Sequence, residues 1–385
     1  MSTTNQLFGM PASLYTAKVR SYLIKQQIPF VERVVGDTYF GEKIVPVVGR
    51  LIMPVVESDE GDIVQDGADI IDYFEAQQPR STPAIPGTAV HRAVSYLFES
   101  FGGEGLLRPA MHYRWNFDDR HLAFLKNDFC VGLMPNGSAQ ECEAAFEFAS
   151  GQMRKATQSF GVTDASIPLI EASYAEFLKL FSAHLSESNY LLGGHATLGD
   201  FGLVSALYAH LARDPVPAEL MRTTAPEVSR WVERMNSPQS FVVKPSDGDP
   251  QLFADDGIPF TLKAMMAFIA EEYLPELIAH TTFANDWLSQ QTDLKAGTNG
   301  LDDPGRRFIG RTEFEWRGIT LKTTVMPYRF YLLQRLQDSV VSASEHEQQV
   351  IRALFEETGL IEMLDLRTHR RVERVNHLEV WGSES

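Results

Sequence analysis

The spacing of apolar positions changes several times within the first eighty residues. Leu7 and Phe8 make a short apolar stretch, which is followed by a loop rich in residues that disfavour helix. Beyond the loop, apolar residues recur at the spacing of one helical face, at Tyr15, Val19, Tyr22 and Leu23. The pattern predicts a strand at residues 7–8 and a helix at about 14–26, which Pro29 would end.

Strands and helices continue to alternate up to about residue 78. We expect a strand at 30–35, a short helix near 40–44, and a hairpin of strands at 55–57 and 63–64. A further helix would carry the apolar positions Ile70, Ile71, Tyr73 and Phe74. The order predicts an α/β domain whose first two strands are parallel and joined by a right-handed helical crossover.

Helical spacing dominates after a proline-rich linker at residues 79–86. Apolar stripes at that spacing include Val94, Leu97, Phe98 and Phe101, and also Ile170, Tyr174, Phe177, Leu178, Phe181 and Leu185. Such stripes are more typical of a core than of a ligand-binding surface. An all-helical region is therefore expected after the linker.

Ser13 lies where the first strand is followed by the first helix. Free backbone N–H groups and the positive end of the helix dipole favour an anion at such a place. The hydroxyl can serve as the N-cap of the helix, or it can donate a hydrogen bond to a bound thiolate. The residues around Ser13 leave both interpretations open.

Several short motifs together resemble the glutathione transferase superfamily. Ser13 is followed by Lys18-Val19-Arg20 at the spacing of the Ser/Cys-type members. Met53-Pro54 precedes the third strand, and Asp66-Gly67 begins the helix after the hairpin. A second block, residues 190–236, is similar to the helical domain of the family.

The resemblance implies the fold class. It is an α/β thioredoxin-like domain at residues 1–80 followed by an all-α glutathione transferase C-terminal domain at residues 87–245. Two stretches exceed the plan of the family: an aromatic-rich insertion at about 108–165 and a C-terminal extension at 246–385. Whether the extension forms a third domain or wraps around the helical one stays open.

The C-terminal extension is expected to be mostly helical. Helices are predicted near residues 328–341 and 345–358, the second of them stopped by Gly359. Alternating positions around Arg317-Gly318 predict a β-hairpin.

The resemblance also implies a glutathione site, with glutathione as co-substrate. Ser13 would stabilise the thiolate, because a hydroxyl hydrogen bond and a helix N-terminus can together lower a thiol pKa by roughly one to several units. The glutathione-binding residues would be Met53, Pro54, Gln65, Asp66 and Gly67. Pro54 is expected to follow a cis bond, so that the backbone of Met53 can pair with the cysteinyl part of glutathione. An ordinary edge-strand proline is the alternative.

Gly67 departs from the pattern of the family, in which a Ser or Thr hydroxyl usually binds the γ-glutamyl carboxylate. Gly67 offers only its backbone N–H. Losing a hydrogen bond to a charged group predicts glutathione binding that is weaker by about one or two orders of magnitude, unless Gln65 compensates. Asp66 would either meet the γ-glutamyl ammonium or cap the helix.

The electrophile site of the family lies between the two domains. Here the resemblance implies that it is lined by Met10, Pro11, Tyr15, Arg108, His112, Tyr113 and Trp115. Tyr15 and Thr16 are alternative thiolate donors, although Tyr15 is more typical of a core aromatic. Since Ser13 is not a Cys, addition or substitution is favoured over mixed-disulfide reduction, because a thiol at that position would itself be the nucleophile.

Thr197 and Asp200 form a capping-box pattern directly before an apolar helix. The pattern resembles the capping box that nucleates a central helix in the second domain of the family. Asp200 is therefore expected to act in folding and not as a catalytic acid.

Composition narrows the classes of partner. The chain has 385 residues and a formal net charge of -17, and nucleic-acid binding needs a basic footprint. The basic run at residues 367–374 is therefore interpreted as a solvated face or a set of internal ion pairs. No apolar run is long enough to span a bilayer, and the first residues do not form a secretory leader. No membrane partner is expected, and we expect a cytoplasmic protein.

The cysteines and motifs give two further expectations. The two cysteines, Cys130 and Cys142, suit a reducing compartment, and a buried free thiol at Cys130 is favoured over a disulfide. The sequence contains no zinc motif, P-loop or nucleophile elbow, so no metal is expected.

The sequence thus predicts a glutathione transferase-like enzyme in which Ser13 activates glutathione for attack on a small-molecule electrophile. The resemblance implies a homodimer, unless the extension covers or replaces the interface. The alternative is a non-catalytic member of the fold, which uses the insertion and the extension to bind a protein or an apolar ligand.

Overall fold

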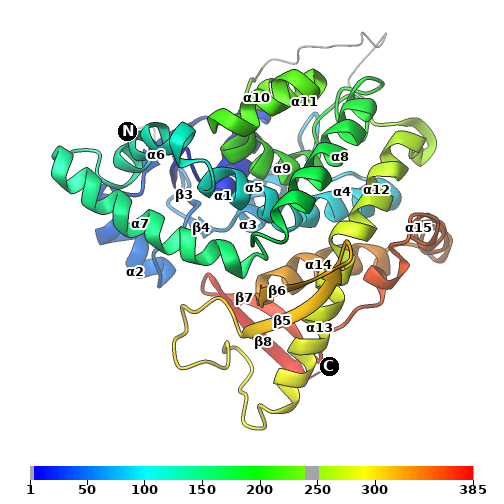
Figure 1. Ribbon diagram of the computed structural model, residues 1–385. Coiled ribbons are helices and arrows are strands. Elements are labelled where there is room, and N and C mark those ends of the chain that lie inside the picture. The colour runs from blue at the N-terminus through cyan, green and yellow to red at the C-terminus, as the bar shows by residue number, and fades with distance from the viewer. Residues whose placement is uncertain (1–3, 239–250, 385) are drawn as a thin grey trace.

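The computed structural model describes residues 4–238 and 251–384 (Figure 1). The N-terminal domain contains a four-stranded sheet of order β2-β1-β3-β4, in which only the β1–β2 pair is parallel. Its elements are β1 (Asn5–Gly9), α1 (Leu14–Lys25), β2 (Phe30–Val34), η1 (Phe40–Ile44), α2 (Val45–Val48), β3 (Val55–Glu57), β4 (Ile63–Gln65) and α3 (Gly67–Gln77). The predicted order of strands and helices is confirmed.

The two faces of this sheet are buried by different helices. Leu7 packs with Val19 of α1 and Ile70 of α3, whereas the next residue, Phe8, packs with Phe40 and the short helices on the other face. Successive strand residues point to opposite faces, so a pair of adjacent apolar residues serves both layers. The adjacent residues Leu7 and Phe8 therefore connect the two layers of the domain.

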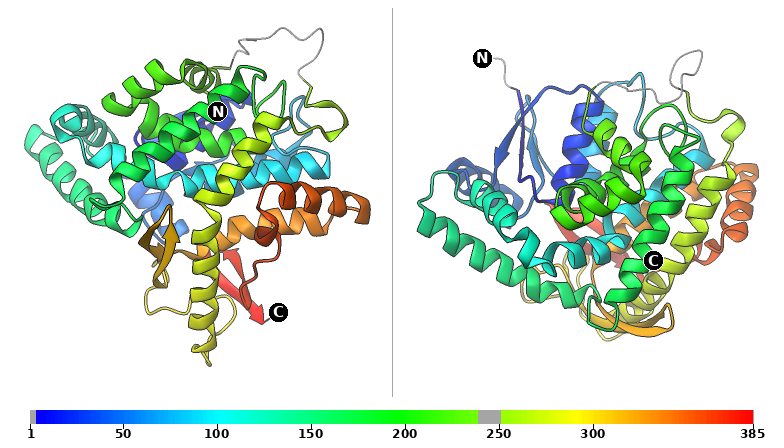
Figure 2. Two further views of the ribbon diagram at one scale, coloured as in Figure 1. Left: turned by 45° about the vertical axis from the view of Figure 1, so that its right-hand side comes forward. Right: turned by 45° about the horizontal axis from the view of Figure 1, so that its top comes forward.

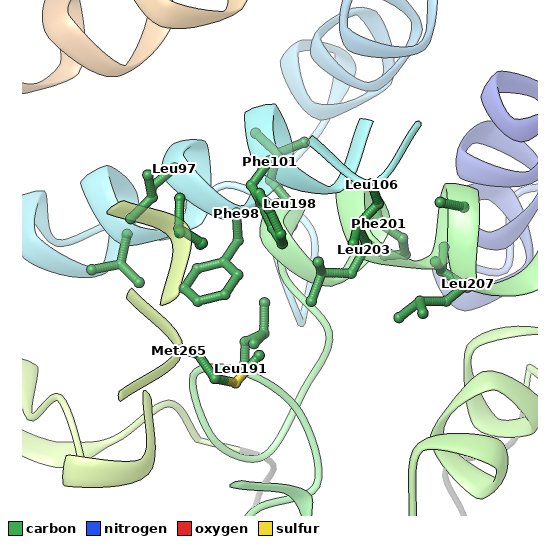
Figure 3. Close-up of a cluster of buried hydrophobic side chains, with 14 of the residues drawn as sticks. Leu97, Phe98, Phe101, Leu106, Leu191, Leu198, Phe201, Leu203, Leu207 and Met265 are labelled. Atoms are coloured by element: carbon green, nitrogen blue, oxygen red, sulfur yellow. The ribbon is translucent and has the colours of Figure 1, made fainter. Parts of the chain in front are cut away.

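Helices make up the second region. They are α4 (Ala89–Ser100), η2 (Phe101–Gly105), α5 (Leu107–Trp115), α6 (Asp118–Leu133), α7 (Ala139–Ser159), α8 (Ile167–Leu185), α9 (Leu198–Ala206), η3 (Leu207–Ala212), α10 (Pro215–Thr224) and α11 (Pro226–Met235). Phe98 of α4 and Leu203 of α9 lie in one cluster of buried side chains (Figure 3). The predicted apolar stripes are thus core.

The capping box before α9 is confirmed. The carboxylate of Asp200 accepts hydrogen bonds from the backbone N–H of Thr197 at 2.9 Å and of Leu191 at 3.1 Å, and from the indole of Trp231 at 3.2 Å. Burial raises the pKa of Asp200 to about 6, although these hydrogen bonds oppose the shift. Asp200 therefore has a structural role as part of the capping box, as the pattern predicted.

Cys130 and Cys142 form a disulfide, so the expectation of a free thiol at Cys130 is wrong. The two residues lie on α6 and α7, the helices of the insertion, which pack against each other. The apolar neighbours of Cys130 suggested a lone buried position, but they gave no information on the helix opposite. Pairing depends on the turn between the helices, which brings the two Cα atoms to 4.8 Å.

The described part of the C-terminal extension packs against the helical domain. It contains η4 (Ala254–Asp256), α12 (Phe260–Glu272), α13 (Leu274–Ser289), β5 (Gly310–Trp316), β6 (Ile319–Val325), α14 (Pro327–Val341), α15 (Glu345–Glu357), η5 (Ile361–Leu364), β7 (Arg370–Val375) and β8 (Leu378–Glu384). Met265 of α12 joins the buried cluster of Figure 3, and α14 lies along α4 (Figure 2). The extension shares core residues with the helical domain, and it also contains a smaller apolar cluster made of its own residues.

The extension contains two β-hairpins. The predicted one is confirmed as β5–β6, which turns at Arg317-Gly318. The second, β7–β8, turns at Asn376-His377, where both residues have positive φ, and it was not predicted. Its strands include the basic run that was expected to form a solvated face or internal ion pairs. Arg370, Arg371 and Arg374 do form ion pairs within the chain.

Candidate functional site

The predicted glutathione residues come together at one edge of the sheet. Phe8 of β1 is opposite Val55 of β3, which is in turn opposite Gln65 of β4. This register brings the end of β1, the start of β3 and the end of β4 to the same edge. The α1–α3 site is the name used below for the residues there: Ser13, Met53, Pro54, Gln65, Asp66 and Gly67.

Ser13 is the N-cap of α1. Its Oγ accepts a hydrogen bond from the backbone N–H of Thr16 at 3.2 Å. Nothing in the described chain accepts the hydroxyl hydrogen. The capping role is confirmed, and it leaves the hydrogen free for an external acceptor, so the two interpretations of Ser13 are compatible.

The Met53–Pro54 peptide bond is cis, as expected. Pro54 is buried, and its carbonyl accepts the backbone N–H of Asp66 at 3.4 Å. Strand β3 begins only at Val55, and among the described residues the backbone of Met53 has no hydrogen bond. Its N–H and C=O groups are therefore available to an extended ligand.

Asp66 caps α3, and its backbone has a φ of 97°. The Oδ1 atom accepts the backbone N–H of Ala68 at 2.8 Å, so the capping interpretation is confirmed. Gly67 lies over Lys18, and a Cβ at this position would be 3.1 Å from Lys18 Cδ. The Nζ of Lys18 forms a buried ion pair with Glu99 Oε1 at 2.5 Å. A serine here would crowd that buried ion pair, which is a physical reason for the departure from the family pattern.

The extension contacts these same residues. The hydroxyl of Tyr328 donates to Asp66 Oδ1 at 2.9 Å. Arg374 donates to the carbonyl and to the Oε1 of Gln65 at 3.1 and 2.6 Å. Gln65 is therefore already engaged and cannot freely replace the hydroxyl that Gly67 lacks.

A third contact joins the extension to the loop before β3. Arg50 donates two hydrogen bonds to Glu379 of β8, at 2.7 and 2.9 Å. Burial alone would raise the pKa of Glu379, but the hydrogen bond from Arg50 and the charges of Arg307 and Arg374 lower it to about 2. Glu379 is therefore an ionised carboxylate among three guanidinium groups.

Tyr15 belongs to a buried polar network. Its hydroxyl donates to Glu104 Oε1 at 3.0 Å, and Arg329 of α14 donates to Glu104 Oε2 at 3.1 Å. Burial, followed by the charge of Glu104, raises the pKa of Tyr15 well above its ordinary value. A hydroxyl already committed to a carboxylate is a poor donor to a thiolate, which favours the structural interpretation of Tyr15.

Three of the predicted electrophile-site residues are held by polar or ring contacts. Arg108 donates to Glu276 of α13 at 2.9 Å and stacks over Trp316 of β5 at 4.7 Å. His112 bonds Glu171 at 3.0 Å. The ring of Tyr113 stacks on that of Phe117 at 5.7 Å, and Tyr113 is buried.

The other members pack mainly with the insertion helices. Met10 and Trp115 belong to one buried cluster with Phe129 of α6, and Met10 lies against Gly132. Pro11 is half-buried beside them. A depression of about 380 Å³ is lined by Trp115 and Arg154 among others, and none of the other predicted members lines it. The structure gives these residues packing partners without bringing all of them around one cavity.

The sequence did not predict five residues that lie near the α1–α3 site: Arg50, Arg307, Tyr328, Arg374 and Glu379. Only Arg374 carried a signal, since it lies in the basic run that was expected to form ion pairs. Each of the others acts across about 250 residues or more of sequence. No local pattern could have joined them to the first domain.

Two absences apply to the described chain only. No group of three or more His, Cys, Asp or Glu side chains in residues 4–238 and 251–384 is placed to hold a metal ion. In the same residues, no helix is both long and apolar enough to cross a membrane.

Two family models match parts of the chain. The family model for the glutathione S-transferase N-terminal domain matches residues 7–82, and that for the C-terminal domain matches residues 170–238. These two segments therefore carry the two domains of the glutathione transferase superfamily. The first match contains the whole α1–α3 site, whereas the insertion helices α6 and α7 and the extension lie outside both matches.

Solved structures of glutathione transferases are similar to about 60% of the chain. They include the β-etherase LigF from Sphingobium sp. strain SYK-6, at 16% identity, over 60% of this chain and 95% of that one, with a TM-score of 0.44. A glutathione S-transferase of Ceriporiopsis subvermispora in complex with glutathione is 19% identical, over 60% and 96% of the two chains, with a TM-score of 0.40. No curated protein matches this chain.

Proposed function

We propose that this protein binds glutathione at the α1–α3 site and that the hydroxyl of Ser13 stabilises the glutathione thiolate for attack on an electrophilic small molecule. The observation that carries the proposal is the state of Ser13. Its oxygen caps α1 while its hydrogen has no acceptor in the described chain. A thiolate beside it would receive that hydrogen bond and lie at the positive end of a 12-residue helix.

The reaction needs little from the protein beyond the thiolate. The thiol proton leaves to solvent, and the sulfur lone pair forms a bond to an electrophilic carbon. In a substitution the leaving group takes the bonding electrons with it, and in an addition the electrons move onto the acceptor, which then takes up a proton. Each unit by which the thiol pKa is lowered is worth about 1.4 kcal/mol of preference for the anion.

The residues present fit the rest of the tripeptide in part. The unbonded backbone of Met53 is available to the cysteinyl segment. The N–H of Gly67 at the start of α3 suits the γ-glutamyl carboxylate. Tyr328 and Ala68 share Oδ1 of Asp66, so its Oδ2 is the atom available to the γ-glutamyl ammonium.

Replacing Ser13 with Ala tests the proposal. The bound thiol should titrate at a higher pH by about one unit or more, which the ultraviolet absorbance of the thiolate reports. Turnover with a panel of electrophiles at pH 7 should fall accordingly, by about tenfold. The matched control is Ser344→Ala, because Ser344 is also a serine N-cap but caps α15 in the extension.

Both variants lose a helix cap, which is worth about 1 kcal/mol. Only Ser13→Ala should change the titration of bound glutathione. An equal thiolate titration in the wild type and in Ser13→Ala would contradict the proposed role of Ser13.

The contacts of the extension favour a second candidate, a non-catalytic binding module. Gln65 and one oxygen of Asp66 already bond Arg374 and Tyr328. Calorimetry with glutathione separates the two functions. Binding at millimolar concentration or tighter supports the enzyme, and no binding supports the module.

The homodimer and the cytoplasmic location are proposals too. Tyr331 and Arg335 of α14 bond Asp69 and Asp72 of α3, and α14 packs along α4. A dimer of this chain would therefore need a surface other than the faces of α3 and α4 that α14 covers. Light scattering of the purified full chain tests the dimer.

A further inference from the structure

Arg307 differs from the other arginines around the α1–α3 site. It lies between α13 and β5, and its Nε is buried without a hydrogen-bond partner. The Nε atoms of Arg50, Arg80 and Arg234 also lack a hydrogen bond, but other nitrogens of those residues donate hydrogen bonds. Within residues 4–238 and 251–384, Arg307 has neither a hydrogen bond nor an ion pair.

Several contacts locate its guanidinium beside the α1–α3 site. The Cζ of Arg307 is 5.9 Å from the ring centroid of Tyr328, whose hydroxyl binds Asp66. Two residues earlier in the chain, a Cβ built on Gly305 would be 3.9 Å from the Cβ of Arg50. The guanidinium of Arg307 therefore lies against the tyrosine that binds the N-terminus of α3, and the segment just before Arg307 lies near the loop that leads to β3.

The charges around Arg307 keep it protonated. Burial acts to lower the pKa of Arg307, but Glu379, Tyr15 and Glu104 together raise it above the ordinary value. The guanidinium therefore carries a full positive charge.

The neighbouring carboxylates are already in use. Glu379 binds Arg50 and Arg374, and Glu104 binds Arg329 and Tyr15. Leaving a partly buried charge without a hydrogen-bonded counter-ion is unfavourable, and native proteins generally avoid it. The side chain of Arg307 as a whole is half-buried, although its Nε is fully buried.

We propose that Arg307 binds a carboxylate of the ligand at the α1–α3 site, in place of the hydroxyl that Gly67 does not supply. A guanidinium matches a carboxylate with two parallel N–H donors, which makes it a strong substitute for one serine hydroxyl. The inference rests on the proposed function, under which the ligand is glutathione and the carboxylate is one of its two. It assigns to the extension a binding role in addition to its packing role.

Calorimetry on the full chain tests the role of Arg307. Glutathione should bind Arg307→Met about 10- to 100-fold more weakly than it binds the wild type. Arg307→Lys should recover part of the lost affinity, because lysine keeps the positive charge but lacks the two parallel N–H donors of a guanidinium. The matched control is Arg306→Met, because the exposed Arg306 side chain only stacks on Phe308, and its affinity should equal that of the wild type.

A second ligand identifies the carboxylate. γ-Glutamylcysteine lacks the glycyl carboxylate of glutathione. If Arg307→Met lowers the affinity for both ligands equally, Arg307 binds the γ-glutamyl carboxylate. If it lowers the affinity for glutathione alone, Arg307 binds the glycyl carboxylate. Either result supports the proposal.

Thermal unfolding without ligand gives a readout that does not need glutathione. Arg307→Met removes the attraction between Arg307 and Glu379 but no hydrogen bond, so its Tm should fall less than that of Glu379→Gln, which breaks two hydrogen-bonded ion pairs. Equal glutathione affinity in the wild type and Arg307→Met, or a Tm of the unliganded Arg307→Met as low as that of Glu379→Gln, would overturn the role of Arg307. A wild type that does not bind glutathione would overturn the proposed function as well.

Discussion

Individual residues in this chain show how one type of side chain acquires opposite properties from its surroundings. Asp200 and Glu379 are both buried carboxylates. The hydrogen-bond partners of Asp200 are neutral groups, so burial prevails and its pKa rises to about 6. Glu379 has three guanidinium neighbours, so charge prevails and its pKa falls to about 2. The role of Asp200 was readable from Thr197 three residues before it, whereas the arginines around Glu379 come from distant segments.

Asp200 predicts a pH dependence of stability at the residue scale. Its folded pKa is about 6 and lies above the ordinary value of 3.8, so the folded state holds the proton more tightly than the unfolded state. The associated stability is complete below about pH 4 and is lost as the pH rises through about 6, up to about 3 kcal/mol.

Urea unfolding at pH 4.5 and pH 7 measures this effect. The free energy of unfolding of Asp200→Asn, relative to that of the wild type, should be higher at pH 7 than at pH 4.5, so the variant gains relative stability as the pH rises. Asp338→Asn, at an exposed ion pair with Arg371, provides the control and should show no such gain. A relative stability of Asp200→Asn that does not change with pH would contradict the prediction.

At the scale of elements, the sequence predicted what depends on local periodicity. Helices α14 and α15 and the hairpin β5–β6 lie close to their predicted positions, because each has its own apolar pattern and stop signal. The hairpin β7–β8 was not predicted because its first strand consists of three arginines, one glutamate and only two valines. Charged strands of this kind are fixed by partners elsewhere in the chain, here Asp69 and Asp338.

The disulfide gives a prediction for the α6–α7 pair. Cys130 and Cys142 close a loop of about a dozen residues, and a cross-link of that size stabilises the closed segment by about 3 kcal/mol. Adding a thiol reductant should speed limited proteolysis within residues 134–138, which connect the two helices. The double variant Cys130→Ser, Cys142→Ser should be cleaved quickly with or without reductant. A cleavage rate of the wild type that reductant does not change would refute the stabilising role of the bond.

On the scale of the whole molecule, the extension and the two family domains form one structure. Met265 of α12, Leu333 of α14 and Phe355 of α15 all enter the main core, and polar contacts tie β7–β8 to the α1–α3 site. The sequence predicted a third domain or a wrapping segment without deciding between them, because amphipathic helices show which face is apolar and not what covers it.

The predicted glutathione residues formed one site because they follow the strand ends of one small sheet. The electrophile residues did not share one cavity, because the insertion and the extension supply packing partners that the family plan lacks.

Glu379 connects these parts, and its removal gives a prediction for the whole molecule. In Glu379→Gln, Arg50 and Arg374 would lose a buried carboxylate, and breaking such a pair costs about 3–5 kcal/mol. The folded pKa of Glu379 is lowered to about 2 from an ordinary 4.5, so its contribution is present above about pH 4.5 and is lost as the pH falls toward 2. Wild-type stability should therefore fall more steeply than that of Glu379→Gln when the solution is acidified.

Hydrogen exchange and urea unfolding measure the effect of Glu379→Gln. Amides of β7 and β8 should exchange faster in this variant, because the hairpin loses its attachment to the loop before β3. Glu384→Gln, which changes an exposed ion pair with Arg370 on the same hairpin, is the matched control and should cost less than about 1 kcal/mol. If the two variants were equally stable at pH 7, the arginines around Glu379 would not depend on its charge. The contact between the hairpin and the first domain would then be held by the hydrogen bonds of Arg374 to Gln65 instead.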